Sequence, residues 1–208
     1  MSTKINKSSN KDKFFMKLAF ELAKSRKGLT GDNPPVGCVI VNNDNRILSI
    51  GITGINGTPH AEINAINSSI ESVKNASLYV TLEPCIHYGK TPPCTNAIIK
   101  NGIKKVIYSI DDIDPRVKSG AKSILSKEKI IVRKNLLKNV ARDFYKPYIH
   151  NRKFKLPYVT GKIALTRNNV ITSDQTKKIT SLHSDKLTHY LRYKNDSILI
   201  SSNTLNKD

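Results

Sequence analysis

The sequence predicts an α/β protein in which helices pack on one mainly central sheet. Short apolar runs of strand length alternate along the chain with segments whose apolar residues recur every three or four positions. With 208 residues, the chain is long enough for one complete domain and part of a second. A hydrophobic content of 38% and a charged content of 25% are typical of globular proteins and exclude collagen and a coiled-coil rod.

The chain opens with a polar stretch that leads into a helix. Residues 1–11 are polar, and we expect them to be disordered. From 12 to 27 the apolar residues, among them Phe15, Leu18 and Leu22, recur at helical spacing and predict an amphipathic helix. A signal sequence is not expected here, because charged side chains interrupt the apolar stretch.

Strands and helices then alternate as far as residue 146. The apolar run 36–41 and its return at 47–53 are joined by a polar turn and predict a hairpin. A proline precedes the helical spacing of 60–70, and another proline ends the strand 78–82. We expect 12–146 to form one domain. Its remaining predicted elements are a helix at 95–100, a strand at 106–110, a helix at 118–127, a strand at 129–132 and a helix at 135–146.

The last quarter of the chain predicts a second, incomplete unit. The basic segment 147–156 is typical of a linker. Residues 157–208 contain strand-like segments at 158–166 and 197–201 and a helical segment at 182–194. This pattern begins an α/β unit, but the chain stops before a sheet is completed.

The charge of the chain bears on its partners. Its 35 basic and 16 acidic side chains give a formal charge of +19, which invites a nucleic-acid partner. The lysines are scattered, however, and no basic cluster alternates with stacking aromatic residues, so a polynucleotide is not the expected partner. No apolar run approaches the roughly 20 residues of a membrane span. With no signal sequence and no span, the cytoplasm is the expected compartment.

The chemistry of the sequence centres on His60, Glu62, Cys85 and Cys94. One histidine and two cysteines form a donor set that Zn²⁺ takes at catalytic sites, with its fourth position left for water. The metal lowers the pKa of that water, and Glu62 is a carboxylate close enough to move protons. A disulfide between the two cysteines, or a surface histidine beside structural cysteines, is the alternative. Cys38 lies within an apolar run, and we expect it in the core.

The spacing of His60 and Glu62 sets a condition on the local structure. Residues two apart on a regular helix point to different faces, so His60 must lie at the very start of its helix for both to reach one site. Pro59, immediately before it, is compatible with that position. If Cys94 likewise begins the next helix, the helix dipole favours its thiolate.

These motifs resemble the signature of the zinc-dependent cytidine deaminase-like superfamily, a His-x-Glu followed by Pro-Cys and a second cysteine. Most members place the two cysteines two residues apart, whereas residues 86–93 separate Cys85 from Cys94 here. That insert resembles the deaminase domain of the bifunctional riboflavin-biosynthesis deaminase/reductases. The resemblance runs from about residue 14 to the C-terminus. Three further segments carry it: 33–41, 59–65 and 79–85.

The resemblance implies a three-layer sandwich with a central mixed sheet, followed by an incomplete α/β reductase domain. It implies hydrolytic removal of an amine from a phosphoribosylated diaminopyrimidinone, which yields the corresponding aminouracil and ammonia. It assigns His60, Cys85 and Cys94 to one Zn²⁺ and Glu62 to proton transfer, and it also implies a homo-oligomer. Five further residues match substrate-contact positions of the family: Asn33, His87, Lys90, Asp112 and Asp114.

Some positions depart from the family pattern. Asp114 stands where the family often has Asn, so an acceptor replaces a side chain that both donates and accepts. Thr53 stands where many members have a histidine, and Lys178 where they have a tryptophan. Because the chain ends within the reductase-like part, reductase activity is not expected, and NADPH is implied only for a complete reductase domain. Four residues match reductase positions that contact substrate or NADPH: Lys162, Arg192, Thr204 and Asp208.

Two other functions remain open from the sequence. A tRNA or nucleic-acid base deaminase would share the zinc chemistry and use the positive charge, but the eight-residue gap between the cysteines argues against it. A non-catalytic, zinc-stabilised partner subunit of a separate reductase is the alternative outside enzymes. The complete ligand set together with Glu62 argues against that second alternative.

Overall fold

The structure is a computed structural model of the whole chain, divided into two compact units, Met1–Tyr158 and Val159–Asp208, which are described separately below. Among the described residues, no helix combines the length and the apolar character that a membrane crossing requires. The structure describes all residues except 1–9, 90, 118–119, 172–178, 203–205 and 207–208.

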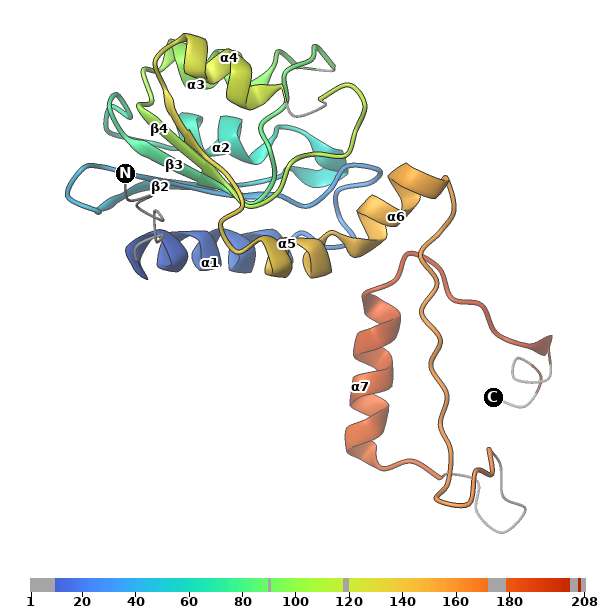
Figure 1. Cartoon of the computed structure of the whole chain (residues 1–208). Helices are drawn as coiled ribbons and strands as arrows, with labels where there is room; N and C mark the ends of the chain where they lie inside the picture. The colour runs from blue at the N-terminus through green and yellow to red at the C-terminus, as the bar shows by residue number, and fades with distance from the viewer. Residues whose placement is uncertain (1–9, 90, 118–119, 172–178, 203–205, 207–208) are drawn as a thin grey trace, which may run out of the picture. The chain divides into compact units, whose positions relative to one another are not determined.

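A five-stranded mixed sheet forms the centre of the first unit (Figure 1). Its strands are β1 (Gly37–Val41), β2 (Ile47–Ile52), β3 (Ser77–Val80), β4 (Lys105–Tyr108) and β5 (Ile131–Arg133). They lie in the order β2-β1-β3-β4-β5, where β1 runs antiparallel to β2 and β3, and β3, β4 and β5 run parallel. The predicted hairpin and the predicted mixed sheet are confirmed.

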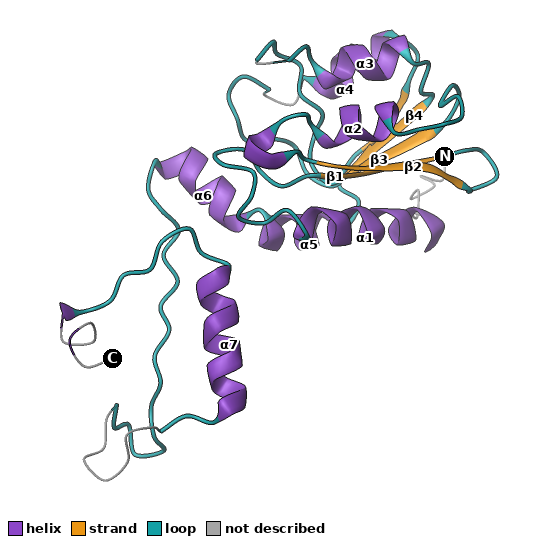
Figure 2. Ribbon diagram, turned by 180° about the vertical axis from the view of Figure 1, so that it is seen from behind, coloured by secondary structure: helices purple, strands orange, loops and turns teal. Residues whose placement is uncertain are grey.

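Helices cover both faces of this sheet and complete a three-layer sandwich (Figures 1 and 2). One face carries α2 (Ala61–Asn67), α3 (Cys94–Lys100) and α4 (Ala121–Lys127). The other carries α1 (Asn10–Lys24) and α5 (Lys138–Phe144), and α6 (Lys146–Phe154) follows α5 directly. A short 3-10 helix, η1 (Ile55–Gly57), lies between β2 and α2.

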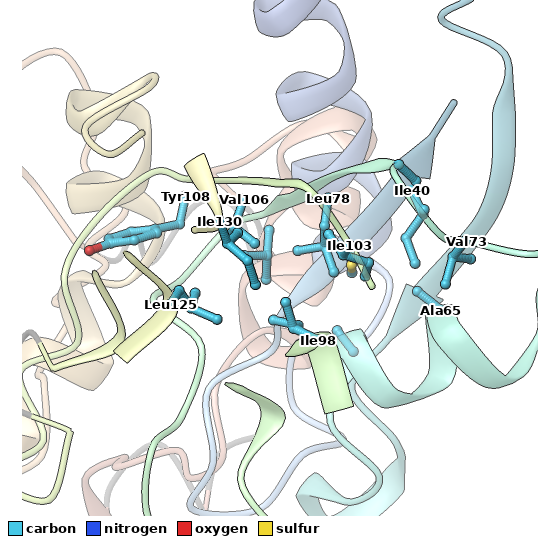
Figure 3. Packing of buried hydrophobic residues seen from close by; sticks show 14 of the residues in the cluster. Ile40, Ala65, Val73, Leu78, Ile98, Ile103, Val106, Tyr108, Leu125 and Ile130 are labelled. Atoms are coloured by element: carbon cyan, nitrogen blue, oxygen red, sulfur yellow. The ribbon is translucent and has the colours of Figure 1, made fainter. Parts of the chain in front are cut away.

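The strands are apolar on both faces because both faces are covered. Ile40 and Leu78 point to one side and pack with Ile98 of α3 in a single cluster (Figure 3). Val39 and Tyr79, the next residues along the same strands, pack on the other side against α1 and α5. Full burial of an aliphatic side chain stabilises the fold by about 1.5–3 kcal/mol. Cys38 is fully buried in the first cluster, so its predicted place in the core is confirmed.

The predicted start of the first helix is wrong by two residues. Asn10 and Lys11, expected to be disordered, belong to the first turn of α1. The helix is anchored there by Asp12, which is buried, accepts a hydrogen bond from the Tyr79 hydroxyl at 2.6 Å and pairs with Lys105 at 3.6 Å. A buried charge paired in this way fixes the first turn to the sheet.

The linker predicted at 147–156 is wrong, because most of it forms α6. Pro147 lies in the first turn of that helix, where its fixed backbone angle and missing N–H are tolerated. Tyr148 and Ile149 pack against the cluster beneath α1 and α5. The lysines that suggested a linker are the exposed side chains of this helix.

The second unit contains α7 (Leu182–Tyr193), which is capped by Ser181, whose hydroxyl accepts a hydrogen bond from the Ser184 amide at 3.3 Å. The strands predicted at 158–166 and 197–201 are wrong, since no residue of either segment belongs to a strand. A strand needs a neighbour for its hydrogen bonds. Neither segment has such a neighbour among the described residues.

Candidate metal centre

The candidate site lies at the edge of the sheet where β2, β3 and β4 end and β1 begins. Loops that follow parallel strands meet at such an edge, which is where α/β proteins bind ligands. A cavity of about 210 Å³ opens there. Its lining includes His60, Glu62 and Cys85.

The start of α2 brings His60 and Glu62 to this cavity. His60 is the residue before the first turn, with extended backbone angles of −68° and 157°, so the condition set by the i, i+2 spacing is met. Glu62 lies inside the first turn and is 4% exposed. Gly51 of β2 allows the close approach of the helix, because a Cβ there would lie 2.0 Å from the Ala61 carbonyl oxygen.

Cys85 and Cys94 complete the donor set. Cys94 is the first residue of α3, one position before the predicted start of that helix. All three cysteines are free thiols, so the disulfide alternative does not hold. The His60 Nδ1 lies 3.2 Å from the Cys94 Sγ and 3.4 Å from the Cys85 Sγ. A tetrahedral Zn²⁺ separates a nitrogen from a sulfur donor by about 3.5 Å, given its usual bond lengths. The three donors therefore fit zinc as they stand.

Hydrogen bonds and burial tune the protonation of this cluster. The Cys85 sulfur accepts hydrogen bonds from Cys94 and His60, which hold its pKa well below the usual range. The hydrogen bond to Cys85 raises the pKa of His60 to about 9. Burial raises the pKa of Glu62 to about 7. The pKa of Cys94, in contrast, is raised by its hydrogen bond with Cys85 and by burial, so the expected effect of the helix dipole does not dominate there. The cluster thus favours a thiolate, the form that binds metals, at Cys85, beside a carboxyl group able to exchange a proton near neutral pH.

Glu83 holds two walls of the cavity through one carboxylate. The side chain is 3% exposed and accepts hydrogen bonds from the backbone amides of Asp112 at 3.0 Å and Ala121 at 3.1 Å. Burial raises the pKa of this carboxyl group to about 7. The loop after β4 and the start of α4 are therefore both fixed two residues away from the zinc-ligand candidate Cys85.

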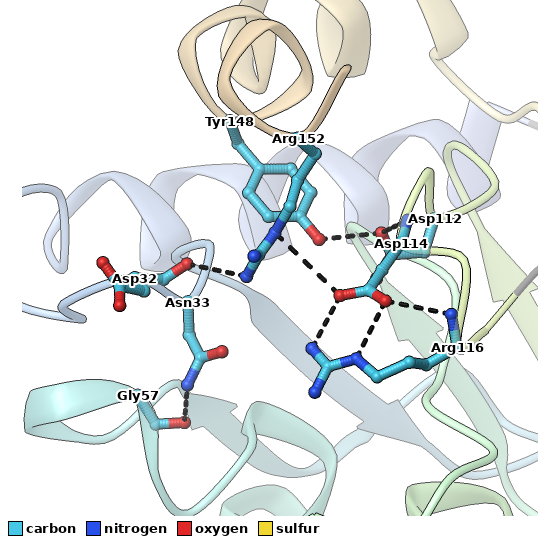
Figure 4. Close-up of polar contacts among 8 residues, drawn as sticks. All are labelled: Asp32, Asn33, Gly57, Asp112, Asp114, Arg116, Tyr148 and Arg152. Carbon is cyan, nitrogen blue, oxygen red and sulfur yellow. Dashed lines mark hydrogen bonds and ion pairs between the residues drawn. The ribbon is translucent and has the colours of Figure 1, made fainter. Parts of the chain in front are cut away.

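The loop after β4 is tied to α6 by a polar cluster (Figure 4). The Tyr148 hydroxyl donates to the Asp112 carboxylate at 2.9 Å. Arg116 donates from Nε and Nη2 to the two oxygens of Asp114 at 2.9 and 2.6 Å, and the Nε of Arg152 lies 3.9 Å from the same carboxylate. These contacts, Arg116 first, hold the pKa of Asp114 well below its usual range, whereas burial raises that of Asp112.

The two cavity loops that contain Asn33 and Gly57 are held by fewer side-chain contacts than the loop after β4. The side-chain amide of Asn33 donates to the Gly57 carbonyl at 3.5 Å. Only glycine fits at position 57, because a Cβ there would lie 2.1 Å from the Asn33 Nδ2. Arg152 donates to the Asp32 carbonyl at 3.3 Å, so α6 reaches this loop as well. Thr53, which also lines the cavity, accepts a hydrogen bond from a backbone amide at 2.8 Å.

Comparison with known proteins gives this site a family. A family model, the cytidine and deoxycytidylate deaminase zinc-binding region, matches residues 9–110. The diaminohydroxyphosphoribosylaminopyrimidine deaminase of Buchnera aphidicola subsp. Schizaphis graminum is 42% identical over 147 residues, which is 71% of this chain and 99% of that protein. The chain belongs to the diaminohydroxyphosphoribosylaminopyrimidine deaminase family.

Other relatives in this deaminase family are longer. The riboflavin biosynthesis protein RibD of Aquifex aeolicus is 40% identical over 199 residues, 95% of this chain and 56% of that protein. The crystal structure of a deaminase/reductase from Thermotoga maritima matches with a TM-score of 0.86 and 37% identity, over 95% of this chain and 57% of its own. The chain thus spans about half the length of the curated relatives it matches first.

The structure gathers most of the substrate-contact residues predicted for this deaminase family. Lys90 lies outside the described residues. The Nδ1 of His87 is buried without a hydrogen-bond partner among the described residues, and a polar ligand atom would satisfy it. The members of the set that line the cavity are Asn33, His87, Asp112 and Asp114.

The positions matched to the reductase belong to the second unit. Lys162 and Arg192 are exposed there, and their roles stay predictions. Thr204 and Asp208, like Lys178, lie outside the described residues.

Sequence reasoning missed several residues that line the cavity. Tyr148 and Arg152 were hidden in the presumed linker, although their spacing of four residues places them on one face of a helix. For Arg116, the sequence favours a solvated loop over a contact with phosphate. Glu83 was noticed only as part of a motif. No sequence signal shows that its carboxylate turns inward to accept two backbone amides.

Proposed function

We propose that the first unit catalyses the hydrolytic deamination of a phosphoribosylated diaminopyrimidinone in riboflavin biosynthesis. The products are the corresponding aminouracil and ammonia. The observation that carries the proposal is that the ligand atoms of His60, Cys85 and Cys94 lie within 4.8 Å of one another, beside a cavity lined by His60, Cys85 and Glu62. Relatives named for this deaminase reaction support the choice of substrate.

His60, Cys85 and Cys94 would hold zinc, which supplies Lewis-acid activation of water when bound. Glu62 provides the proton transfers. With a pKa of about 7, its carboxylate accepts the proton of the attacking water and, as the acid, returns it to the departing amine. Water adds, ammonia leaves, and Glu62 ends in its starting state.

The deciding experiment compares ammonia release by zinc-loaded wild type and Glu62→Gln, with Glu71→Gln as the control. Glu71 lies on the surface in an ion pair with Arg46, so its loss leaves the cavity intact. We expect Glu62→Gln to lose roughly 10²–10⁴-fold in kcat, the usual contribution of a proton-transfer group. Zinc content and melting temperature stay those of the wild type. Equal turnover by both variants, or none by a folded, zinc-loaded wild type, would refute the proposal.

Partner and compartment follow from the same proposal. We place the protein in the cytoplasm, where the three free thiols remain reduced. No NADPH-dependent step is part of the proposal. A homo-oligomer is proposed on the family resemblance alone, and light scattering of the intact chain tests it. The same ammonia assay run with tRNA tests the polynucleotide alternative, for which we expect no turnover.

A further inference from the structure

Two arginines line the cavity that contains the metal-site residues. Arg116 comes from the loop after β4, and Arg152 from α6. Both guanidinium groups lie beside one carboxylate, Asp114, which is 5% exposed (Figure 4). Building on the proposed function, we propose that Arg116 and Arg152 bind the phosphate of the substrate, and that Asp114 holds both arginines in place.

The two arginines keep N–H donors that the protein does not use. Arg116 donates to Asp114 from Nε and Nη2, so two of the five N–H groups of its guanidinium are committed. The Nε of Arg152 is buried and has no hydrogen-bond partner among the described residues, because its distance of 3.9 Å from Asp114 is too long. A buried charged donor without a partner is costly, and an oxygen atom of a ligand would remove that cost.

Two acidic side chains face the two arginines in this part of the cavity. Both guanidinium groups lie beside the carboxylate of Asp114, and Asp112 is close enough to interact electrostatically with each of them. The neighbouring Asp112 does not pair with either arginine through a hydrogen bond, since its carboxylate accepts from Tyr148 and from a backbone amide. Guanidinium groups match the oxygen atoms of a phosphate in pairs, which makes arginine well suited to this ligand.

The carboxylate of Asp114 sets the orientation of Arg116. An uncharged amide at this position could not hold a guanidinium group with a pair of charged hydrogen bonds. Here the carboxylate orients Arg116 with contacts of 2.9 and 2.6 Å. Asp114 thus fixes the position of the Arg116 guanidinium, and Arg116 supplies the N–H donors for the phosphate.

The test uses zinc-loaded intact chain and two substrates, the phosphorylated compound and its dephosphorylated riboside. The variants are Arg116→Gln and Arg152→Gln, with Arg46→Gln, an exposed arginine outside the cavity, as the control. We expect each cavity variant to raise KM for the phosphorylated substrate about tenfold or more, the loss of a charged hydrogen bond, with little change in kcat. Their kinetics on the riboside should match those of the wild type.

Three results separate the inference from the proposed function. An equal loss on both substrates would make the arginines structural, and no loss on either would refute phosphate binding outright. If the wild type turns over neither substrate, the proposed function fails. In that case titration calorimetry with ribose 5-phosphate still tests the inference, which requires binding by the wild type and a weakening of about tenfold or more in each variant. Should Arg152→Gln fail to fold, Arg152→Lys keeps the positive charge without the paired N–H donors of a guanidinium group. This variant should show an intermediate loss of affinity for the phosphorylated substrate.

Discussion

The two units of this chain use similar sequence patterns with opposite results. In the first unit, β1 is buried along its whole length because helices cover both faces of its sheet. In the second unit, α7 contains no buried residue, and its Leu182 and Tyr193 are 77% and 74% exposed. An amphipathic pattern builds a core only where the chain also supplies the surface to be covered. Matched substitutions in the two units test this difference.

The largest difference in stability between matched variants of the two units is expected for leucine. Leu78 in β3 is fully buried, whereas Leu187 in α7 is 55% exposed. Leu78→Ala should lower the free energy of unfolding by about 2–5 kcal/mol through lost burial and a cavity. Leu187→Ala should change it by less than about 0.5 kcal/mol. Urea denaturation followed by circular dichroism measures both, and similar losses would mean that α7 has a core of its own.

Glycine gives the second difference. A Cβ at Gly51 would lie 2.0 Å from the Ala61 carbonyl oxygen, whereas one at Gly161 would meet nothing within 4 Å. Gly51→Ala should therefore cost about 1–3 kcal/mol by forcing α2 away from β2. Gly161→Ala should leave the melting temperature unchanged. Because His60 immediately precedes α2, zinc affinity should fall in the first variant alone. Unchanged affinity would contradict the close packing of α2 on β2 at this contact.

Tyrosine gives the smallest difference. The hydroxyl of Tyr145 is buried, lies 2.6 Å from the Thr81 Oγ1 and donates to the Pro35 carbonyl at 3.1 Å. Removing it in Tyr145→Phe should cost about 1 kcal/mol. Tyr193→Phe, on an exposed ring of α7, should cost nothing measurable. Thermal denaturation of the two variants side by side settles the point: coincident melting curves would show that the buried hydroxyl contributes nothing.

Most elements of the first unit could be predicted from the sequence because their signals are local. Each strand is a short apolar run, and each helix has its own spacing. The strands predicted at 158–166 and 197–201 failed for the complementary reason, since a strand exists only beside another strand and no local pattern reports that neighbour. For α6, exposed lysines concealed the two residues, Tyr148 and Ile149, that attach it to the core.

The candidate site divides in the same way. His60, Glu62, Cys85 and Cys94 could be named from the sequence because zinc chemistry restricts both residue type and spacing. The position of His60 before the first turn of α2 could be predicted as well, because His60 and Glu62 are two residues apart and would otherwise point to different faces of the helix. Arg152 could not be named, because its contacts with Asp32 and Asp114 join segments 120 and 38 positions away in the chain.

One side chain described above affects how this protein can diversify. The carboxylate of Glu83 accepts hydrogen bonds from the backbone amides of Asp112 and Ala121. Both ends of the segment 112–121 are therefore held by one side chain, two residues before Cys85 in the chain. Substitutions between those ends can alter the cavity wall while the fastening points stay in place. Selection can therefore change ligand preference in this segment, Arg116 included, independently of the metal-binding residues. A change at Glu83 itself would release both ends at once.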